Sequence, residues 1–313
     1  MLTSKITRTR DLSGVSGLNE VPMLMLLIGI GVLVQVVFKR ILGLDELFER
    51  ILKKLVDFIY YLLIPLAFTK TYTERGVMVN DLWLMASFII FLVISMASLR
   101  LIVRHGSKDY YNALLITSIF PNAVFLGFPV SLALFGSIHV ASIYGLATLV
   151  LNVVAPDIIA LGKASLIRLI EMPALLGFII GLIGHYLFPP GLAGTIINAL
   201  WWAPYALSYT ATMILGARLP LRVDVLRGNI KFIALTSIYR FMIAPLVTYI
   251  VLFIPGVDWS IVTQAIVVSM MPPAVLNTLI ASKYGWMPEL VASTTFILTL
   301  IVVLCLLFTN LLF

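Results

Sequence analysis

The chain has 313 residues, of which 61% are hydrophobic and 11% charged, and it carries a formal net charge of +7. Soluble proteins contain about 45–50% apolar and about 25% charged residues, so this composition excludes a soluble domain and predicts an all-α polytopic membrane protein. The basic residues lie between apolar runs, where they set membrane orientation, so no nucleic-acid partner is expected. A single cysteine and three separated histidines predict neither a disulfide nor a metal site, and no cofactor is expected.

The chain begins with a polar stretch and continues as a series of apolar runs. Residues 1–19 form an expected N-terminal tail, because no short apolar core precedes a signal-peptide cleavage site. Each later run approaches the roughly 20 apolar residues that cross a bilayer. The ten predicted spans lie near 21–38, 55–72, 80–103, 112–136, 139–160, 170–188, 194–216, 230–253, 260–281 and 288–311.

Lysine and arginine are distributed unequally between the two sets of loops. The loops after odd-numbered spans hold many more of them than the loops after even-numbered spans. Basic loops stay on the cytoplasmic side, so we predict a multi-pass protein of the plasma membrane with both termini extracellular.

The fourth span contains residues that interrupt a helix. Pro121, Asn122, Gly127 and Pro129 all lie within it. Proline removes a backbone donor, and lipid cannot satisfy the freed carbonyls, so such a break survives at membrane depth only inside protein or beside a cavity. We therefore expect a substrate site here.

The sequence resembles itself when it is shifted by 151 positions, because Phe120-Pro-Asn-Ala-Val124 then falls on Met271-Pro-Pro-Ala-Val275. Five spans in each half place the halves upside down relative to each other. We therefore predict a five-plus-five inverted repeat, residues 20–160 and 161–313, with broken helices 4 and 9 that cross near the bilayer midplane. Two unrelated kinked helices are the alternative interpretation, since proline is common in transmembrane helices.

The predicted breaks create two kinds of charged end. Half-helix starts carry partial positive charge and suit a carboxylate, whereas the carbonyl ends suit a cation. Three asparagines add neutral donors and acceptors at a similar depth. The candidate substrate-binding residues are Pro121, Asn122, Asn152, Pro272, Val275 and Asn277.

The eighth span contains a charged residue, Arg240. An intramembrane charge costs at least about 2.5–3.5 kcal/mol on insertion scales, so Arg240 should face the protein interior and have a partner. In one interpretation it is a charge partner that holds an anion or replaces a cation beside the ninth helix. In the other it pairs structurally with backbone carbonyls or snorkels.

Three stretches together resemble the auxin efflux carrier family, which includes the plant PIN proteins and prokaryotic relatives. Residues 120–136 resemble the family's fourth-helix signature, and residues 271–285 with 288–293 resemble its ninth-helix signature and the start of the tenth. Ile64-Pro-Leu-Ala-Phe68 resembles the second-helix pattern.

The resemblance implies a scaffold of helices 1, 2, 6 and 7 that forms a homodimer, and a moving domain of helices 3–5 and 8–10 with elevator-type alternating access. By position, Pro121 and Pro272 match the crossover prolines. Asn122 matches the asparagine beside the first crossover, and Asn152 matches a fifth-helix amide near the substrate.

Two features of the family are missing from this sequence. The long hydrophilic loop between helices 5 and 6 of many plant carriers is absent. The family's Asp-plus-Lys pair at the start of helix 3 is not reproduced, because Asp81 stands near the Asp position but Met85 occupies the Lys spacing.

The sequence thus predicts a secondary active transporter that exports a small organic anion, such as an auxin-like carboxylate or a dicarboxylate. The alternative is a sodium- or proton-coupled symporter or antiporter of the bile-acid-transporter or cation-antiporter type, which shares crossed broken helices. The sequence contains no Gly-x-Ser-x-Gly elbow, no His-Glu-x-x-His and no P-loop, so neither an enzyme nor ATP drive is expected.

Overall fold

The computed structural model describes residues 20–104, 106–163, 169–218 and 230–312, and these residues form helices without any strand. Five helical stretches in this part of the chain are long and apolar enough to cross a membrane, and shorter apolar helices lie among them. The five are Val21–Ile41, Val79–Ile102, His139–Leu161, Ile230–Phe253 and Pro288–Phe308. The structure thus agrees with a helical, multi-pass membrane protein, while the number of ten spans stays a prediction.

The helices of the first half follow the predicted runs, with several short interruptions. They are α2 (Glu20–Val36), η1 (Val37–Ile41), α3 (Asp45–Phe58), η2 (Ile59–Leu63), α4 (Ile64–Arg75), α5 (Val79–Ile102), α6 (Lys108–Ile119), η3 (Ala123–Gly127), α7 (Phe128–Phe135) and α8 (His139–Leu161). The second half contains α10 (Pro173–Leu187), α11 (Pro190–Ala199), α12 (Ala203–Ala217), α13 (Ile230–Ile238), η5 (Tyr239–Ile243), α14 (Ala244–Phe253), α15 (Trp259–Ser269), α16 (Leu276–Tyr284) and α17 (Pro288–Leu312). The predicted boundary at residues 160/161 lies at the end of α8.

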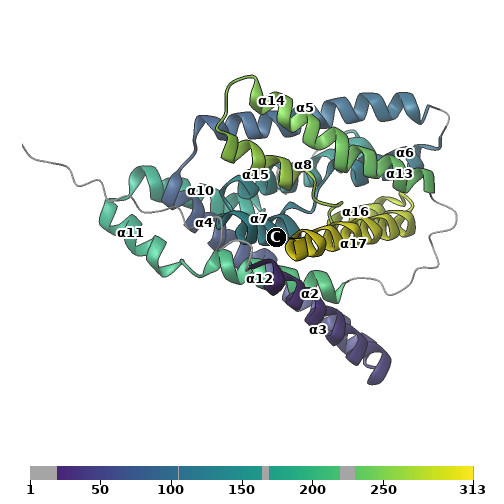
Figure 1. Cartoon of the computed structure of the whole chain (residues 1–313), viewed down its shortest axis with the longest axis horizontal. Coiled ribbons are helices and arrows are strands. Elements are labelled where there is room, and N and C mark those ends of the chain that lie inside the picture. Colours follow the sequence, from purple (N-terminus) through teal and green to yellow (C-terminus); the bar gives the residue numbers. More distant parts are fainter. Residues whose placement is uncertain (1–19, 105, 164–168, 219–229, 313) are drawn as a thin grey trace, which may run out of the picture.

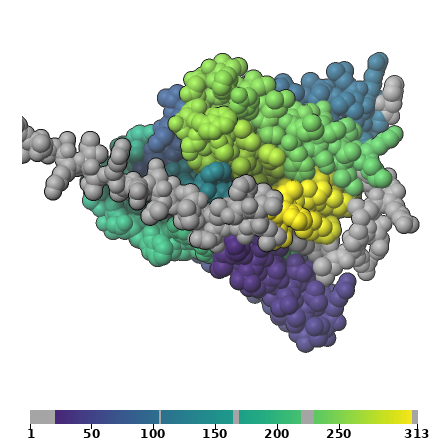
Figure 2. Space-filling view, viewed as in Figure 1, coloured from purple at the N-terminus to yellow at the C-terminus, as the bar shows by residue number. Residues whose placement is uncertain are grey.

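The second predicted span is longer than its apolar run. Helical structure continues without a gap from Asp45 to Arg75, whereas hydropathy marked only 55–72. The additional segment, α3, is charged on its exposed side and buries Phe48 and Leu52 on the other. The mean hydropathy averages the charged and the apolar side chains, so it does not reveal such an amphipathic helix. In Figure 2, α2 and α3 project together from the lower right of the molecule.

The seventh predicted span, 194–216, is two helices in the structure. α11 ends at Ala199 and α12 begins at Ala203. Pro204 has no N–H group and favours the first turn of a helix, so it starts α12 and does not continue α11. The Trp202 indole donates to the Ala199 carbonyl at 3.0 Å and closes the turn between them.

Three of the π-helical turns are closely followed by a proline. One residue separates the end of η2, η3 and η5 from Pro65, Pro129 and Pro245, respectively. A proline ring clashes with the carbonyl four residues earlier and leaves it without a donor. A wider turn moves that carbonyl aside, so the chain stays helical through the proline.

Two of the helix pairs that join the first half of the chain to the second are α2 with α12 and α4 with α10. Glycine allows their close approach, because a Cβ on Gly216 would overlap the Ile28 backbone and one on Gly177 would overlap the Pro65 backbone. In Figure 1 these pairs occupy the lower and left parts of the molecule, whereas α5 and α14 contact each other across the top.

Candidate functional site

The two non-helical linkers, residues 120–122 after α6 and 270–275 after α15, cross and bind each other. The Asn122 N–H donates to the Pro272 carbonyl at 2.7 Å, and the Ala274 N–H donates to the Phe120 carbonyl at 2.9 Å. Pro121 and Pro273 thereby form an isolated antiparallel bridge. Of the candidate residues, Pro121, Asn122 and Pro272 meet directly at this crossing.

The helices restart differently after the two linkers. The Asn122 side-chain oxygen accepts the Phe125 N–H at 3.2 Å and caps η3, as asparagine commonly does at a helix start. α16 begins after Val275 without a side-chain cap. The first restart is therefore held by a side chain whose amide nitrogen has no hydrogen-bond partner in the described ranges.

Asn277 connects the crossing to α8. Its side-chain nitrogen donates to the carbonyls of Ile116, at 3.0 Å, and Phe120, at 3.2 Å. Its oxygen must then face Asn152, whose side-chain nitrogen donates to it at 3.1 Å. The network assigns both amide orientations, and it leaves the Asn152 oxygen as an acceptor with no protein partner in the described part of the chain.

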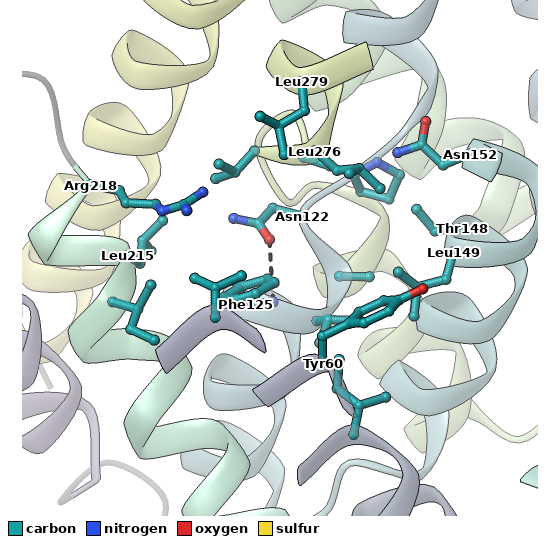
Figure 3. Close-up of a pocket in the computed structure, with 18 of the residues that line it drawn as sticks. Tyr60, Asn122, Phe125, Thr148, Leu149, Asn152, Leu215, Arg218, Leu276 and Leu279 are labelled. Atoms are coloured by element: carbon teal, nitrogen blue, oxygen red, sulfur yellow. Dashed lines mark hydrogen bonds between the residues drawn. The ribbon is translucent and has the colours of Figure 1, made fainter. Parts of the chain in front are cut away.

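A cavity of about 260 Å³ lies beside the crossing. Pro121, Asn122, Asn152 and Val275 line it, whereas Pro272 and Asn277 support it from behind through the bonds described above. Figure 3 shows Asn122 near the centre of the view and Asn152 at its upper right.

Three buried polar atoms of this wall lack a hydrogen-bond partner among the described residues: Asn122 Nδ2, Asn152 Oδ1 and Thr148 Oγ1. All three side chains are less than 5% exposed. An unpaired buried polar group costs about 1–3 kcal/mol, so native proteins keep few of them without a reason. One donor, one acceptor and one hydroxyl of the lining residues thus have no protein partner among the described residues.

The sequence analysis did not single out two further lining residues, Thr148 and Arg218. Thr148 lies one helical turn before Asn152, so the i, i+4 spacing on one face of α8 could have revealed it. Arg218 directly follows the last residue of α12, and in the sequence it resembles an ordinary basic loop residue. Figure 3 shows its guanidinium pointing toward Asn122, and the only carboxylate among the described lining residues, Asp57, is exposed on α3.

Arg240 lies on the other side of the crossing and does not line this cavity. It is 1% exposed and donates to the Ile119 carbonyl at 3.0 Å, the Met271 carbonyl at 2.9 Å, and more weakly to the Ser118 carbonyl. It also donates to the Ser269 carbonyl. The guanidinium thus binds the carbonyl ends of both α6 and α15, and all these contacts are with backbone atoms.

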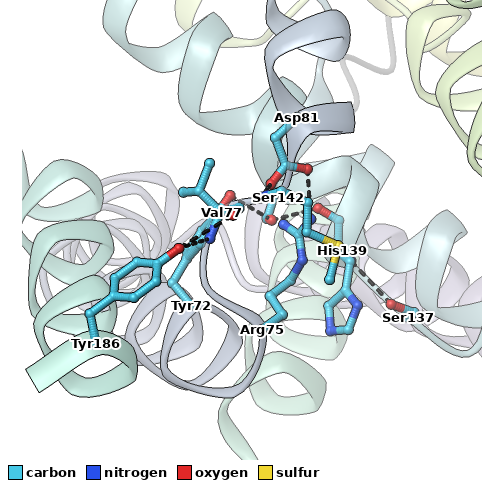
Figure 4. Close-up of polar contacts among 9 residues, drawn as sticks. Tyr72, Arg75, Val77, Asp81, Ser137, His139, Ser142 and Tyr186 are labelled. Atoms are coloured by element: carbon cyan, nitrogen blue, oxygen red, sulfur yellow. Dashed lines mark hydrogen bonds and ion pairs between the residues drawn. The ribbon is translucent and has the colours of Figure 1, made fainter. Parts of the chain in front are cut away.

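A second polar cluster lies where α4 turns into α5 (Figure 4). Arg75 pairs with Asp81 at 2.6 Å, and the other Asp81 oxygen accepts the Met78 N–H at 2.9 Å. The hydroxyl groups of Tyr72 and Ser142 lie 3.0 Å apart and join α4 to α8. Asp81 therefore has a cation from the preceding helix, where the family pattern would place a lysine at position 85.

No group of three or more His, Cys, Asp or Glu side chains that could hold a metal ion occurs within the described ranges. The polar groups described above are mainly amides, hydroxyl groups and arginines. These groups bind by hydrogen bonds and charge.

One comparison with known proteins bears on this geometry, and it covers the first break. Residues 47–162 match the family model described as membrane transport protein. The matched stretch runs from α3 to the end of α8 and contains Pro121, Asn122, Thr148 and Asn152. No curated protein matches the chain. The predicted resemblance to the auxin efflux carrier family is confirmed over this stretch, and the family indicates that the chain is a membrane transporter.

Proposed function

We propose that the chain is a secondary active transporter that binds a small organic anion in the cavity at the crossing and exports it. The observation that carries the proposal is the unpaired Asn122 amide nitrogen, with Arg218 facing it across the same cavity. A carboxylate can bind both the amide nitrogen and the guanidinium, because its oxygens accept hydrogen bonds and its negative charge attracts the arginine.

The rest of the wall supports a ligand with a mainly apolar body. Ile64, Val124, Phe125, Leu149 and Leu276 contribute apolar surface to the lining. Asn152 Oδ1 and Thr148 Oγ1 add an acceptor and a hydroxyl for one further polar group. A cavity of about 260 Å³ suits a small molecule, since drug-sized ligands occupy about 300–1,000 Å³.

The contacts of Arg240 favour an anion carrier over the sodium- or proton-coupled alternative. In that alternative the carbonyl ends of the broken helices hold an exchangeable cation. Here a fixed guanidinium already binds the carbonyls of Ile119, Ser269 and Met271. We therefore propose that Arg240 replaces the coupling cation at these carbonyls and leaves the cavity side for the substrate.

The helix contacts are consistent with the five-plus-five inverted repeat, which remains part of the proposal. In the repeat, α2 corresponds to α10, and α4 to α12. The pair α2–α12 is then the counterpart of the pair α10–α4, and both pairs occur. Likewise α5–α6 corresponds to α14–α15, and both are in contact. We further propose that α2–α4 and α10–α12 form the scaffold of a homodimer, past which α5–α8 and α13–α17 move as an elevator.

The test is a thermal-shift screen of the purified protein against aromatic and aliphatic carboxylates, in sodium and in choline buffers. A ligand at a hundredfold excess over its Kd stabilises the folded state by about 2.7 kcal/mol. We expect a carboxylate to raise Tm equally in both buffers and to raise it less in Asn122→Ala. Asn198→Ala, at an exposed asparagine on α11, is the matched control.

Stabilisation by sodium alone would contradict the proposal and favour the cation-coupled alternative. A carboxylate found in the screen then becomes the substrate for flux measurements in vesicles. Equal flux for Asn122→Ala and the unaltered protein would show that the substrate binds elsewhere.

A further inference from the structure

A second cavity, of about 640 Å³, lies at the opposite end of α6 from the crossing. The end of α5, the start of α6 and Ile159 of α8 form it. Among the described residues it shares no lining side chain with the cavity at the crossing. It is therefore a separate site, and its role does not depend on the function proposed above.

Three basic side chains line this second cavity, and no carboxylate does so in the described part of the chain. They are Arg100, Arg104 and Lys108. None of them takes part in an ion pair found among the described residues. Asp109, the nearest carboxylate in sequence, is exposed and lies outside the lining. The cavity thus carries a concentration of positive charge without a carboxylate counterion among the described residues.

A buried residue with an unpaired donor also belongs to the lining of this cavity. Asn112 lines it and is 2% exposed, and its side-chain nitrogen has no hydrogen-bond partner among the described residues. Ser107, the cap of α6, lines it as well, so the partial positive charge of a helix start adds to that of the arginines. Charge alone would attract any anion, but a buried, unpaired donor selects a group that can accept a hydrogen bond.

The surroundings of the cavity suit a lipid. α5 is one of the five helices long and apolar enough to cross a membrane, and Arg100 and Arg104 lie at its end. Between them Leu101 and Ile102 are 76% and 56% exposed. Basic residues beside exposed apolar ones at the end of a membrane helix match the headgroup and acyl chains of an anionic phospholipid.

We propose that Arg100, Arg104, Lys108 and Asn112 bind the phosphate group of an anionic phospholipid. The phosphate lies in the second cavity, where it accepts a hydrogen bond from Asn112 and is attracted by the three cations. The acyl chains lie along the exposed apolar side of α5. The bound lipid holds the start of α6, the helix whose other end forms the crossing.

The experiment measures Tm of the full-length protein in neutral detergent with added phosphatidylglycerol, phosphatidylcholine or inorganic phosphate. We expect phosphatidylglycerol alone to raise Tm. In Arg100→Gln/Arg104→Gln we expect its apparent affinity to fall roughly thirtyfold, since each basic residue near an anionic lipid contributes about a fivefold factor. The control Arg50→Gln/Lys53→Gln removes the same charge from the exposed side of α3 and should bind like the unaltered protein.

Each other outcome overturns a defined part of the proposal. An equal loss of binding in the control would mean that the lipid responds to net charge only. An equal effect of inorganic phosphate would mean that the cavity takes a soluble anion and no lipid. If phosphatidylglycerol does not change the Tm of the unaltered protein, the second cavity is not a binding site for this lipid. Asn112→Ser, which keeps a small polar side chain, should bind the lipid more weakly than the control, and unchanged binding would exclude the asparagine.

Discussion

On one side of the crossing Arg240 donates to the carbonyls of Ile119 and Met271, while on the other side Asn122 and Asn152 each keep one amide atom without a partner among the described residues. The two sides share the same linkers and are equally buried. On the Arg240 side the chain leaves carbonyls that its own helices cannot satisfy. Asn122 N–H, for example, binds Pro272 and so cannot reach Ser118, and Pro273 has no N–H to offer Ser269.

This difference separates structural polar groups from binding polar groups within one site. A group whose partners all belong to the protein stabilises the fold, and its loss should appear in the free energy of unfolding. A buried group without a partner lowers stability in the empty protein, and its loss should appear in ligand affinity. The four predictions below test this separation, from the largest expected effect on stability to the smallest.

Arg240→Met should destabilise the protein by roughly 3–5 kcal/mol, because at least two buried carbonyls lose their donor at about 1–3 kcal/mol each. Thermal unfolding in detergent measures the effect. Arg240→Lys keeps the charge but donates to fewer carbonyls, so its Tm should lie between those of Arg240→Met and the unaltered protein. If all three proteins unfold at the same temperature, the arginine does not hold the crossing together.

Asn277→Leu keeps the side-chain volume and should cost about 1–3 kcal/mol, because the buried Asn152 nitrogen loses its partner. The Phe120 carbonyl still accepts from Ala274, and the Ile116 carbonyl from Phe120 N–H. Ligand affinity should fall as well, since Asn152 is then free to rotate. Tm and carboxylate binding measured on one sample test both effects, and a loss of stability with full affinity would separate Asn152 from the binding site.

Asn122→Ala should cost about 1 kcal/mol in stability, because η3 loses its cap while an unpaired nitrogen disappears with it. Carboxylate affinity should fall about tenfold to a hundredfold, since a hydrogen bond to a charged group contributes about 1.5–3 kcal/mol. Isothermal titration of the carboxylate found in the screen measures the affinity. Unfolding at a temperature as low as that of Arg240→Met would place Asn122 among the structural groups.

Thr148→Val should change stability by less than about 0.5 kcal/mol or raise it slightly, because an isosteric methyl group replaces a buried hydroxyl without a partner. Affinity for a ligand with a second polar group should fall, while affinity for a simple monocarboxylate should not. The comparison needs two ligands of similar size and one binding assay. A destabilised variant would show that the hydroxyl has a partner in the folded protein.

The sequence predicted the candidate residues of the crossing better than it predicted their surroundings. Pro121 and Pro272 identify the linkers because the missing N–H is a local property of the residue. The partners of Arg240 are carbonyls from two helices far away in sequence, and no residue type marks them. Arg218 looked like a loop residue, since only the packing of α12 against α2 and η3 brings it to the cavity.

The helix boundaries show a similar limit. The runs of apolar residues indicated the five long helices that could cross a membrane. They did not indicate α3, whose buried Phe48 and Leu52 are separated by charged residues. They also joined α11 and α12, because the turn between them contains Leu200, Trp201 and Trp202, which are as apolar as a span. Tryptophan commonly lies at the interface between membrane and water, so this turn could have been suspected from Trp201 and Trp202.

The pairing of α2 with α12 and of α4 with α10 also has a consequence for biogenesis. A ribosome delivers α2 and α4 to the membrane before α10 and α12 exist. During that interval the surfaces that later receive Gly177 and Gly216 face lipid or the insertion machinery. The surfaces of α2 and α4 that pack on these two glycines are therefore covered only after translation has passed residue 217.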